Sequence, residues 1–238
     1  MRLLFTRRHV VVAIASLCAA SLLAACGGLQ PEDPGLVLKQ GGAAMATLKT
    51  VNAKMKISKG TITFQGFTLV SANAALKLPN ESDSTYLVRQ QDIQIGLEVV
   101  VIDGHYFLKP PLLRFTALTA AQAAEIPNLA MLFDPVHGLP AVIPAGKNPQ
   151  YEGAESIDGV DCHKVSAIYT AEQINGLLPQ LASQGAVTAN IWVDGSDHFI
   201  RKAVLGGNFG DNGALSEVEV DLSNFNGSVH IASPGRTS

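Results

Sequence analysis

The stretch IQIGLEVVVIDGHYFLK, residues 93–109, decides the fold. Every second residue from Ile93 to Val101 is apolar, and these residues share one face of an extended chain because side chains alternate across a strand. Asp103-Gly104 follows, and both residues tolerate the positive φ that a two-residue hairpin turn requires. The stretch therefore predicts two antiparallel strands, Ile93–Ile102 and His105–Lys109, joined by a tight turn.

The same two-residue period recurs on both sides of this hairpin. From Val51 to Ser58, apolar residues alternate with lysines and other polar residues, which is typical of a half-buried strand. Asp158-Gly159 provides a second turn signal between two such runs. Further strands are expected at Thr61–Leu69, Ala72–Leu78, Ser84–Gln90, Gln150–Ser156, Asp161–Tyr169, Ala186–Asp194, His198–Leu205, Leu215–Leu222 and Ser228–Ala232.

Helical segments interrupt the strands at a few places. Thr119 and Thr170 each precede a helical pattern as candidate N-caps. The helices are expected at Leu36–Thr50, Thr119–Glu125, Leu129–Phe133, Val136–Ile143 and Ala171–Gln184. Clean alternation and tight hairpins predict an α+β fold, in which one large antiparallel sheet has one face covered by helices.

The N-terminus carries an export signal. Arg2, Arg7 and Arg8 precede an uncharged apolar run from Val10 to Ala25, which ends in Leu23-Ala-Ala-Cys26. Small residues directly before a cysteine form a bacterial lipobox, so we expect cleavage before Cys26 and a diacylglycerol on its sulfur. An uncleaved transmembrane helix is the alternative, and the apolar run is shorter than the ~20 residues that span a bilayer.

This signal divides the chain into four parts. They are the signal peptide at 1–25, a lipidated tether at 26–35, one folded domain at 36–232 and a polar tail at 233–238. Removing the signal leaves 14 basic and 20 acidic side chains, a net charge of −6. Such a surface does not favour nucleic acid as a partner. The expected location is the outer face of the cell membrane, held by the anchor.

The residues give no catalytic or metal-binding pattern. The five histidines after the signal stand in no zinc-binding spacing, and there is no nucleophile elbow or phosphate-binding loop. Gly195–His198 reads as a turn between strands, and Cys162 and His163 point to opposite faces of one strand. Trp192 fits a strand packing position, with stacking on a sugar as the alternative. We therefore expect no enzyme activity, no metal and no cofactor.

The predicted core is short of bulk. Only 14 of 238 residues are aromatic, and many expected core positions carry the small side chains of Ala72, Ala74, Ala75, Gly96, Ala189 and Ala203. A well-packed core of small residues is one outcome. A sheet that leaves an apolar cavity beneath its helices is the other.

Several segments resemble the LppX/LprA/LprF/LprG family of bacterial lipoproteins. The matching segments are Val99–Leu108 (VVVIDGHYFL), Leu132–Leu139 (LFDPVHGL), Tyr151–Gly159 (YEGAESIDG), Ile191–Asp194 (IWVD) and Leu222–Phe225 (LSNF). Their order and spacing behind a lipobox carry the resemblance, which runs from about Leu36 to Ala232. Phe225 stands where relatives usually have a tryptophan.

The resemblance implies a fold and a function. The family has a half-barrel fold, similar to the LolA/LolB carriers, in which a curved antiparallel sheet has helices on its concave face. Members bind acylated lipids or glycolipids in a hydrophobic cavity and carry or chaperone them in the envelope, and a membrane lipid exporter is a possible partner. On the expected strand faces and cover, the cavity residues would be Ile95, Leu97, Val99, Leu132, Leu177, Leu181, Ile191 and Val193. A scaffold or protein-interaction module without a lipid is the alternative function.

Overall fold

The protein is described by a computed structural model that covers residues 29–64 and 66–234, with Phe64 placed in its backbone only. The predicted signal peptide, Cys26 and residues 235–238 lie outside the described residues. The strands are β1 (Thr50–Lys59), β2 (Ile62–Phe64), β3 (Phe67–Lys77), β4 (Glu81–Gln90), β5 (Ile93–Ile102), β6 (His105–Lys109), β7 (Thr116–Ala117), β8 (Lys147–Ile157), β9 (Val160–Tyr169), β10 (Val187–Asp194), β11 (Ile200–Phe209) and β12 (Ala214–Ser223).

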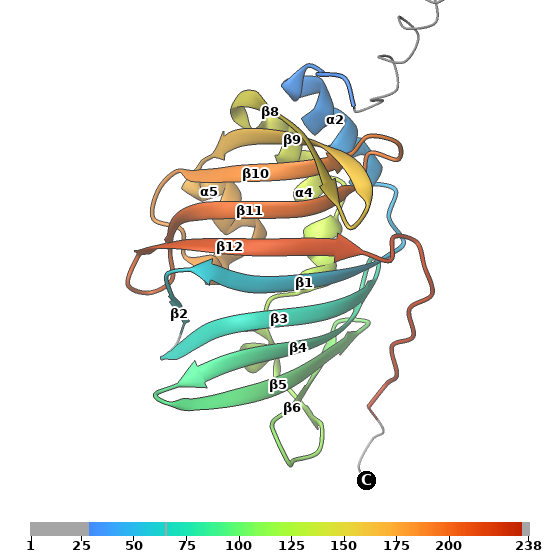
Figure 1. Cartoon of the computed structure of the whole chain (residues 1–238). Helices are drawn as coiled ribbons and strands as arrows, with labels where there is room; N and C mark the ends of the chain where they lie inside the picture. The colour runs from blue at the N-terminus through green and yellow to red at the C-terminus, as the bar shows by residue number, and fades with distance from the viewer. Residues whose placement is uncertain (1–28, 65, 235–238) are drawn as a thin grey trace, which may run out of the picture.

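These strands form one antiparallel sheet. Its order is β7-β6-β5-β4-β3-β1-β12-β11-β10-β9-β8, with β2 paired to β3 beside this path. Neighbouring strands are mostly consecutive in sequence, so the sheet consists of two meanders that meet where β1 pairs with β12. The sheet curves without closing, and β7 and β8 form its two edges (Figure 1). The α+β curved-sheet prediction is confirmed.

The hairpin that decided the fold forms as expected. Val99 pairs with Leu108 and Ile102 with His105, so β5 and β6 are joined through Asp103-Gly104. These two turn residues have φ values of 49° and 78°. Asp158-Gly159 joins β8 and β9 in the same way, with φ values of 50° and 81°. Left-handed backbone at both positions matches the twist of the flanking strands.

Short helices cover the concave face of the sheet and one of its ends (Figure 1). The helices and 3₁₀ turns are α2 (Pro34–Met45), α3 (Ala120–Ala124), η1 (Leu129–Phe133), α4 (Leu139–Val142), η2 (Ile143–Ala145), α5 (Ala171–Leu177) and η3 (Pro179–Leu181). Thr119 and Thr170 cap α3 and α5 with complete capping boxes, as their sequences predict. No helix among the described residues is long and apolar enough to cross a membrane.

Three helix boundaries differ from the prediction. The first helix begins at Pro34, where Asp33 caps it by accepting from the Leu36 N–H at 2.8 Å, and it ends at Met45 rather than Thr50. The helix expected at Ala171–Gln184 ends at Leu177, because Pro179 has no N–H to continue the ladder. The helix expected from Val136 begins at Leu139, because the Asp134 side chain accepts two backbone N–H groups and holds a turn there.

Two strand predictions are also wrong. The chain turns at Gly66, where φ is 79°, so Phe67–Lys77 is one strand with an irregularity between Leu69 and Ser71. No strand forms at Ser228–Ala232. Asn224 and Asn226 take left-handed φ values of 54° and 56° and turn the chain away from the sheet after β12. β12 is already paired with β1 on one side and with β11 on the other, so it has no free edge where residues 228–232 could add a strand.

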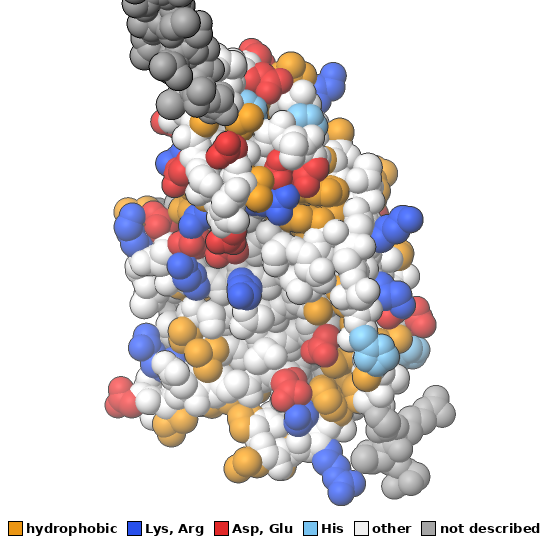
Figure 2. Space-filling model, turned by 45° about the vertical axis from the view of Figure 1, so that its right-hand side comes forward, with side chains coloured by type: hydrophobic (Ala, Val, Ile, Leu, Met, Phe, Trp, Pro, Cys, Tyr) orange, Lys and Arg blue, Asp and Glu red, His pale blue; other side chains and the backbone are white. Residues whose placement is uncertain are grey.

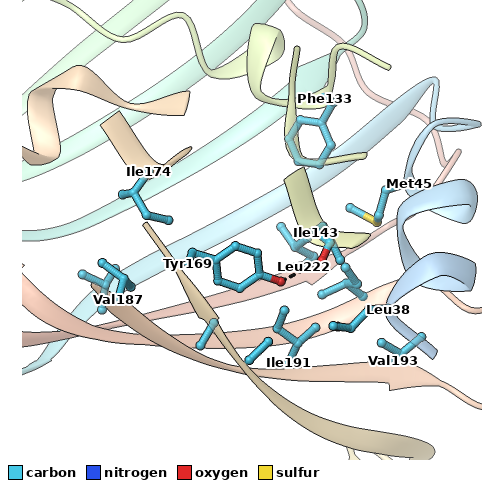
Figure 3. Close-up of a cluster of buried hydrophobic side chains, with 14 of the residues drawn as sticks. Leu38, Met45, Phe133, Ile143, Tyr169, Ile174, Val187, Ile191, Val193 and Leu222 are labelled. Carbon is cyan, nitrogen blue, oxygen red and sulfur yellow. Dashed lines mark hydrogen bonds between the residues drawn. The ribbon is translucent and has the colours of Figure 1, made fainter. Parts of the chain in front are cut away.

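One side of α2 is buried against the sheet. Val37, Leu38 and Met45 on α2 are at most 1% exposed, and α2 contacts α4, η2, β8, β9 and β10. Figure 3 shows Leu38 and Met45 facing Val193, Ile191 and Leu222 of the sheet. α2 therefore seals the end of the sheet at which β10 finishes.

The described part of the predicted tether is docked against the same end. Leu29 fills the space beside Gly195, where even a Cβ atom would clash with Leu29 Cδ2. Glu32 Oε2 lies 3.4 Å from Nε2 of His163, a β9 side chain that is only 5% exposed. The chain thus enters the domain at a fixed place, beside the β8–β9 and β10–β11 turns.

The convex face of the sheet is polar. Lys56 pairs with Glu219 at 3.2 Å and Lys59 with Glu217 at 2.9 Å, which places these alternating residues outside as expected. In Figure 2, acidic and basic side chains are interspersed over the face presented to the viewer. Exposed ion pairs of this kind contribute little to the stability of the fold. They show which face of the sheet is turned to solvent.

Candidate functional site

An apolar cavity of about 440 Å³ lies between the concave face of the sheet and its helical cover. This volume is within the range of ligand sites in proteins, roughly 300–1,000 Å³. The walls come from both meanders of the sheet and from η1, α4, α5 and η3. Of the 36 lining residues, only Tyr86, Glu125, Tyr169 and Gln180 carry polar groups. The site can therefore hold an apolar body but offers few polar contacts.

The cavity is closed at one end and open at the other. Met45, Leu76 and Leu222 line the end beneath α2 and are 1%, 1% and 8% exposed. Lining residues at the opposite ends of the strands are half-exposed, which indicates that solvent reaches the cavity there. They include Phe67, Leu69, Leu177 and Gln180.

Two buried polar atoms lie in the cavity wall without a hydrogen-bond partner among the described residues. They are the Tyr86 hydroxyl and the Gln180 side-chain carbonyl oxygen. Burial raises the pKa of Tyr86 to about 12, so the hydroxyl keeps its proton and is a potential donor. Ser84, on the same strand face, lies close enough to the Tyr86 hydroxyl to oppose this rise in pKa, but the geometry is too poor for a regular hydrogen bond, and Ser84 donates its own hydroxyl to the Val99 carbonyl oxygen at 3.1 Å. Buried polar atoms are nearly always hydrogen-bonded, so these two are candidate contacts for a ligand.

Tyr169 plays a different part in the wall. Its hydroxyl donates to the Ile143 carbonyl oxygen at 2.8 Å, and Figure 3 shows this contact. Burial raises the pKa of Tyr169 above its ordinary value. The bond joins β9 to η2, so Tyr169 fixes the helical cover over the sheet rather than leaving a free polar group.

The structure brings six of the eight predicted cavity residues together around the cavity, three on the sheet and three in the cover. They are Leu97, Val99, Leu132, Leu177, Leu181 and Ile191. Ile95 shares the inward strand face of Leu97 but lies outside the lining, nearer the start of β5. Val193 is fully buried beneath α2, where the position of a Cβ on Gly41 is 3.4 Å from its Cγ2 atom. The predicted strand faces are right, and these two positions lie beyond the cavity.

Several lining residues are absent from the sequence-based set. Tyr86 is one of them. It lies two residues from both Ser84 and Val88, so the period of two could have placed all three on the inward face of the strand. Of the six small residues that the sequence singles out, four line the cavity: Ala72, Ala74, Ala189 and Ala203. Ala75 and Gly96 do not line it. The lack of bulk thus corresponds to a cavity and not to a filled core.

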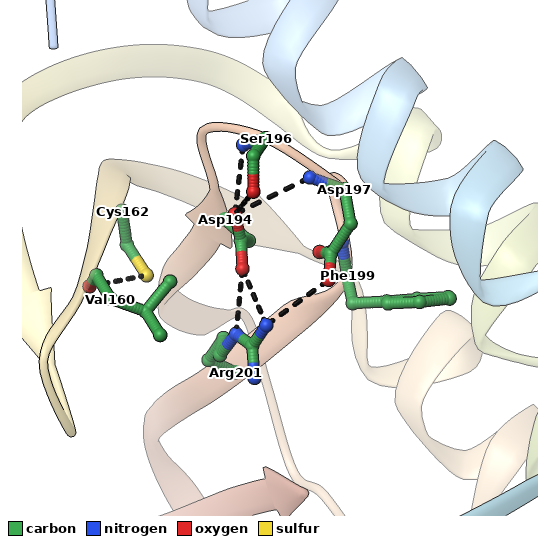
Figure 4. Close-up of polar contacts among 7 residues, drawn as sticks. All are labelled: Val160, Cys162, Asp194, Ser196, Asp197, Phe199 and Arg201. Carbon is green, nitrogen blue, oxygen red and sulfur yellow. Dashed lines mark hydrogen bonds and ion pairs between the residues drawn. The ribbon is translucent and has the colours of Figure 1, made fainter. Parts of the chain in front are cut away.

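The segment Gly195–His198, which the sequence assigns to a turn, has a structural role, and the side chain of Asp194 holds it in place. Asp194 is 1% exposed and accepts from the Ser196 backbone and hydroxyl and from Arg201, which Figure 4 shows. These hydrogen bonds lower the pKa of Asp194 to about 2 despite the opposing effect of burial. They hold the β10–β11 turn.

Cys162 and Trp192 lie nearby on the sheet. Burial raises the pKa of the Cys162 thiol to about 11, so the thiol stays protonated and unreactive. Trp192 is 5% exposed, donates to Glu155 Oε2 at 2.9 Å and has Lys164 and Lys202 against its ring. The ring is covered by these side chains and presents no open stacking surface.

Comparisons with known proteins agree with this geometry. The family model described as LppX_LprAFG lipoprotein matches residues 33–231. The lipoarabinomannan carrier protein LprG of Mycobacterium tuberculosis is 25% identical over 96% of this chain and 95% of its own length.

Solved structures of two relatives share the fold. The crystal structure of LprF from Mycobacterium bovis superposes with a TM-score of 0.67 at 20% identity, over 87% of this chain and 99% of that one. LppX of Mycobacterium tuberculosis superposes with a TM-score of 0.59 at 19% identity, over 84% of this chain and 100% of that one.

Proposed function

Because this chain belongs to the LppX_LprAFG lipoprotein family, we propose that it binds acylated lipids or glycolipids and carries or chaperones them in the cell envelope. Acyl chains occupy the cavity between sheet and cover, and the protein catalyses no reaction on them. The observation that carries the proposal is the cavity itself, which combines about 440 Å³ of space with an almost wholly apolar wall. The name of LprG, a lipoarabinomannan carrier, supports the same class of ligand.

The wall suggests broad acceptance of acyl chains. Apolar contacts favour binding by ~0.8 kcal/mol for each buried methylene, without selecting one chain over another. Selectivity then rests on the few polar atoms, which are the Tyr86 hydroxyl, the Gln180 oxygen and Glu125 at the rim. We expect acyl chains to contact the six lining residues that the sequence identified, from Leu97 to Ile191.

Loading is tested by native mass spectrometry of the protein purified from its own membrane in mild detergent. Wild type should carry lipid, and Ala53→Trp should carry little, because Ala53 lines the cavity in the middle of β1. Lys54→Trp is the matched control, since the next residue faces solvent on the convex side. Val99→Trp tests the wall on the other side of β3, with the same expected loss.

The result also separates carrier from scaffold. A wild-type protein that is consistently free of lipid, with Ala53→Trp indistinguishable from it, would contradict the carrier proposal and favour a protein-interaction module. Co-purification with a membrane lipid exporter would identify the partner that supplies or receives the ligand.

We further propose that residues 1–25 are removed and that a diacylglycerol on Cys26 anchors the protein at the outer face of the cell membrane. The tether predicted at 26–35 is shortened to 26–33, because α2 begins at Pro34, and the domain then extends to 232 with a polar tail at 233–238. Two acyl chains hold a protein at a bilayer far more firmly than one. The intact mass of the membrane-purified protein tests the anchor: it should begin at Cys26 and include the lipid adduct. Cys26→Ala should lose that adduct, and a wild-type mass without it would refute the proposal.

A further inference from the structure

The segment between β6 and α3 ends in an exposed apolar tip. Leu112 is 104% exposed and Leu113 is 62% exposed, although both belong to a residue type that is usually buried. They follow Pro110-Pro111 and precede Arg114. Single exposed leucines are ordinary, but two adjacent ones at a loop tip form a protruding apolar feature.

The backbone holds this tip in place. The Leu113 N–H donates to the Pro110 carbonyl oxygen at 3.2 Å, and Leu112 has a φ of 63°. A turn with this hydrogen bond, proline at its second position and positive φ at its third has type II character, in which the third position favours glycine. Leucine therefore occupies a place where local structure disfavours any side chain. A leucine at this position does not stabilise the turn, but it would be useful if its side chain makes an apolar contact outside the protein.

The tip stands beside the cavity at the β6 edge of the sheet. Leu108, just before the segment, lines the cavity, and Glu125 and Ile126, just after it, line the cavity again. The segment thus leaves the cavity wall and returns to it. Leu108 is half-exposed and Glu125 is exposed, so solvent also reaches the cavity at this edge of the sheet.

The tip is also far from where the tether docks. Leu29 and Glu32 contact the β8–β10 side of the sheet, whereas the tip follows β6, near the other edge of the strand order. Figure 1 shows α2 and the loop beyond β6 at opposite extremes of the molecule. A membrane held by the tether is therefore not the surface that this tip faces.

The charged residues near the tip favour one kind of apolar partner, an anionic bilayer. Lys109 precedes the two leucines but pairs with Glu98 at 2.9 Å, whereas Arg114 directly follows them, and no acidic residue occurs between Gly104 and Glu125. Leucines beside an arginine match an anionic bilayer, where the apolar side chains enter the acyl region and the guanidinium meets the head groups. The rest of the chain is net acidic, so this feature is local.

We propose that the Leu112-Leu113 turn inserts into an anionic lipid bilayer facing the β6 edge of the cavity, where the cavity also reaches solvent. Insertion sets the cavity mouth against that bilayer, where a lipid can pass between cavity and membrane with little exposure to water. The inference rests on the proposed carrier function for its purpose, but bilayer contact can be measured whether or not the cavity holds lipid.

Contact is measured by tryptophan quenching in the full chain. Leu113→Trp is reconstituted in vesicles of phosphatidylcholine and mixed with acceptor vesicles of brominated phosphatidylcholine and phosphatidylglycerol. We expect quenching well above the background of Trp192, which is 5% exposed. Leu215→Trp is the matched control, because Leu215 is 77% exposed on the sheet but lies away from the tip. Quenching should weaken when phosphatidylglycerol is omitted.

The outcomes decide the proposal. Equal quenching of the Leu113 and Leu215 variants, or no quenching, would overturn it. In a second arrangement the brominated lipid is placed in the vesicle that holds the anchored protein. Quenching in that arrangement alone would show that the tip faces the anchoring membrane, and would overturn the proposal.

A second pair of variants tests what the contact does. Leu112→Gly combined with Leu113→Asp keeps the turn, because glycine suits positive φ, and removes the apolar tip. We expect the initial rate of lipid transfer to acceptor vesicles to fall by about tenfold or more, the scale set by withdrawing two leucine side chains from a membrane. Lipid loading by native mass spectrometry should be unchanged. An unchanged transfer rate in a normally loaded variant would refute the proposal, whereas loss of loading in the wild type would refute only the carrier function.

Discussion

Tyr86 carries a buried hydroxyl that no described residue satisfies, and it faces a cavity lined almost wholly by carbon. An unmade hydrogen bond to a buried group costs about 1–3 kcal/mol. Tyr86→Phe should therefore leave the lipid-free protein as stable as wild type or more stable. If a lipid head group accepts from this hydroxyl, the variant should also hold less lipid, or a different set of lipids.

Urea unfolding of the lipid-free protein and native mass spectrometry of the loaded protein measure the two effects. Tyr169→Phe serves as the contrast, because it removes a hydroxyl that donates to Ile143 and should destabilise the protein. A Tyr86→Phe protein that loads the wild-type lipids in the wild-type ratio would exclude the hydroxyl as a lipid contact.

Asp194 makes stability depend on pH. Its pKa is lowered to about 2 in the folded protein, from roughly 3.9 in an unfolded chain. A group with a depressed folded pKa stabilises the fold above its unfolded pKa and loses that effect as the pH falls toward the folded value. At pH 7, Asp194→Asn should lower the free energy of unfolding by roughly 2 kcal/mol, through lost charge-assisted hydrogen bonds to Ser196 and Arg201.

The difference between wild type and Asp194→Asn should shrink as the pH falls from about 5 toward 2. Urea unfolding across this range measures it. Asp92→Asn, a change at an exposed carboxylate, is the control and should show little effect at any pH. A difference that is constant with pH would show that Asp194 acts through shape and not through its charge.

At the scale of elements, α2 contains two neighbouring glycines in different surroundings. A Cβ on Gly42 would lie 2.7 Å from the Pro140 carbonyl oxygen and from Pro144 Cγ, which is too close. A Cβ on Gly41 would lie 3.4 Å from Val193 Cγ2 and 3.5 Å from Ile200 Cγ1, at ordinary contact distance. Gly42→Ala should destabilise the protein by about 1–3 kcal/mol, because the cover must move.

Gly41→Ala should stabilise the protein by up to about 1 kcal/mol, because alanine is the better helix former and its methyl group fits. Thermal unfolding of both variants checks the pair. Opposite signs are required; destabilisation of equal size by both would mean that α2 tolerates no added atom at this contact.

The elements that sequence alone predicts well are those with local signals. Alternation and the Asp-Gly turns fix β5, β6, β8 and β9, and threonine caps fix the starts of α3 and α5. Elements limited by tertiary contacts are predicted poorly. The end of α5 depends on Pro179, and the missing strand at 228–232 depends on β12 already having both neighbours.

The same distinction applies to the site. Alternation predicts which side of a strand faces inward, so Leu97 and Ile191 are placed correctly. It does not predict how far the cavity extends along a strand. Val193 has the right face but lies under α2, a contact that joins residues far apart in sequence.

For the whole molecule, an empty cavity of about 440 Å³ forgoes the contacts that a filled core would make. A ligand that binds only the folded state raises its stability by RT ln(1 + [L]/Kd), about 2.7 kcal/mol at a hundredfold excess over Kd. Delipidated protein should therefore melt at a lower temperature than loaded protein, and reloading should restore the difference. Ala53→Trp, with its cavity blocked, should melt at one temperature with or without added lipid. A wild type indifferent to delipidation would contradict a ligand in this cavity.

The pairing of β1 with β12 sets the order in which this molecule can be completed. Asn52 lies opposite Ser223, so the seam between the two meanders joins the beginning of the domain to its end. A chain that emerges from its N-terminus can form β1 to β7 early, but β1 keeps an open edge until the last strand arrives. Such distant pairings form slowly. On the proposed export route, a chain delivered across a membrane in extended form thus stays incomplete throughout its passage, and its cavity takes shape only after that passage ends.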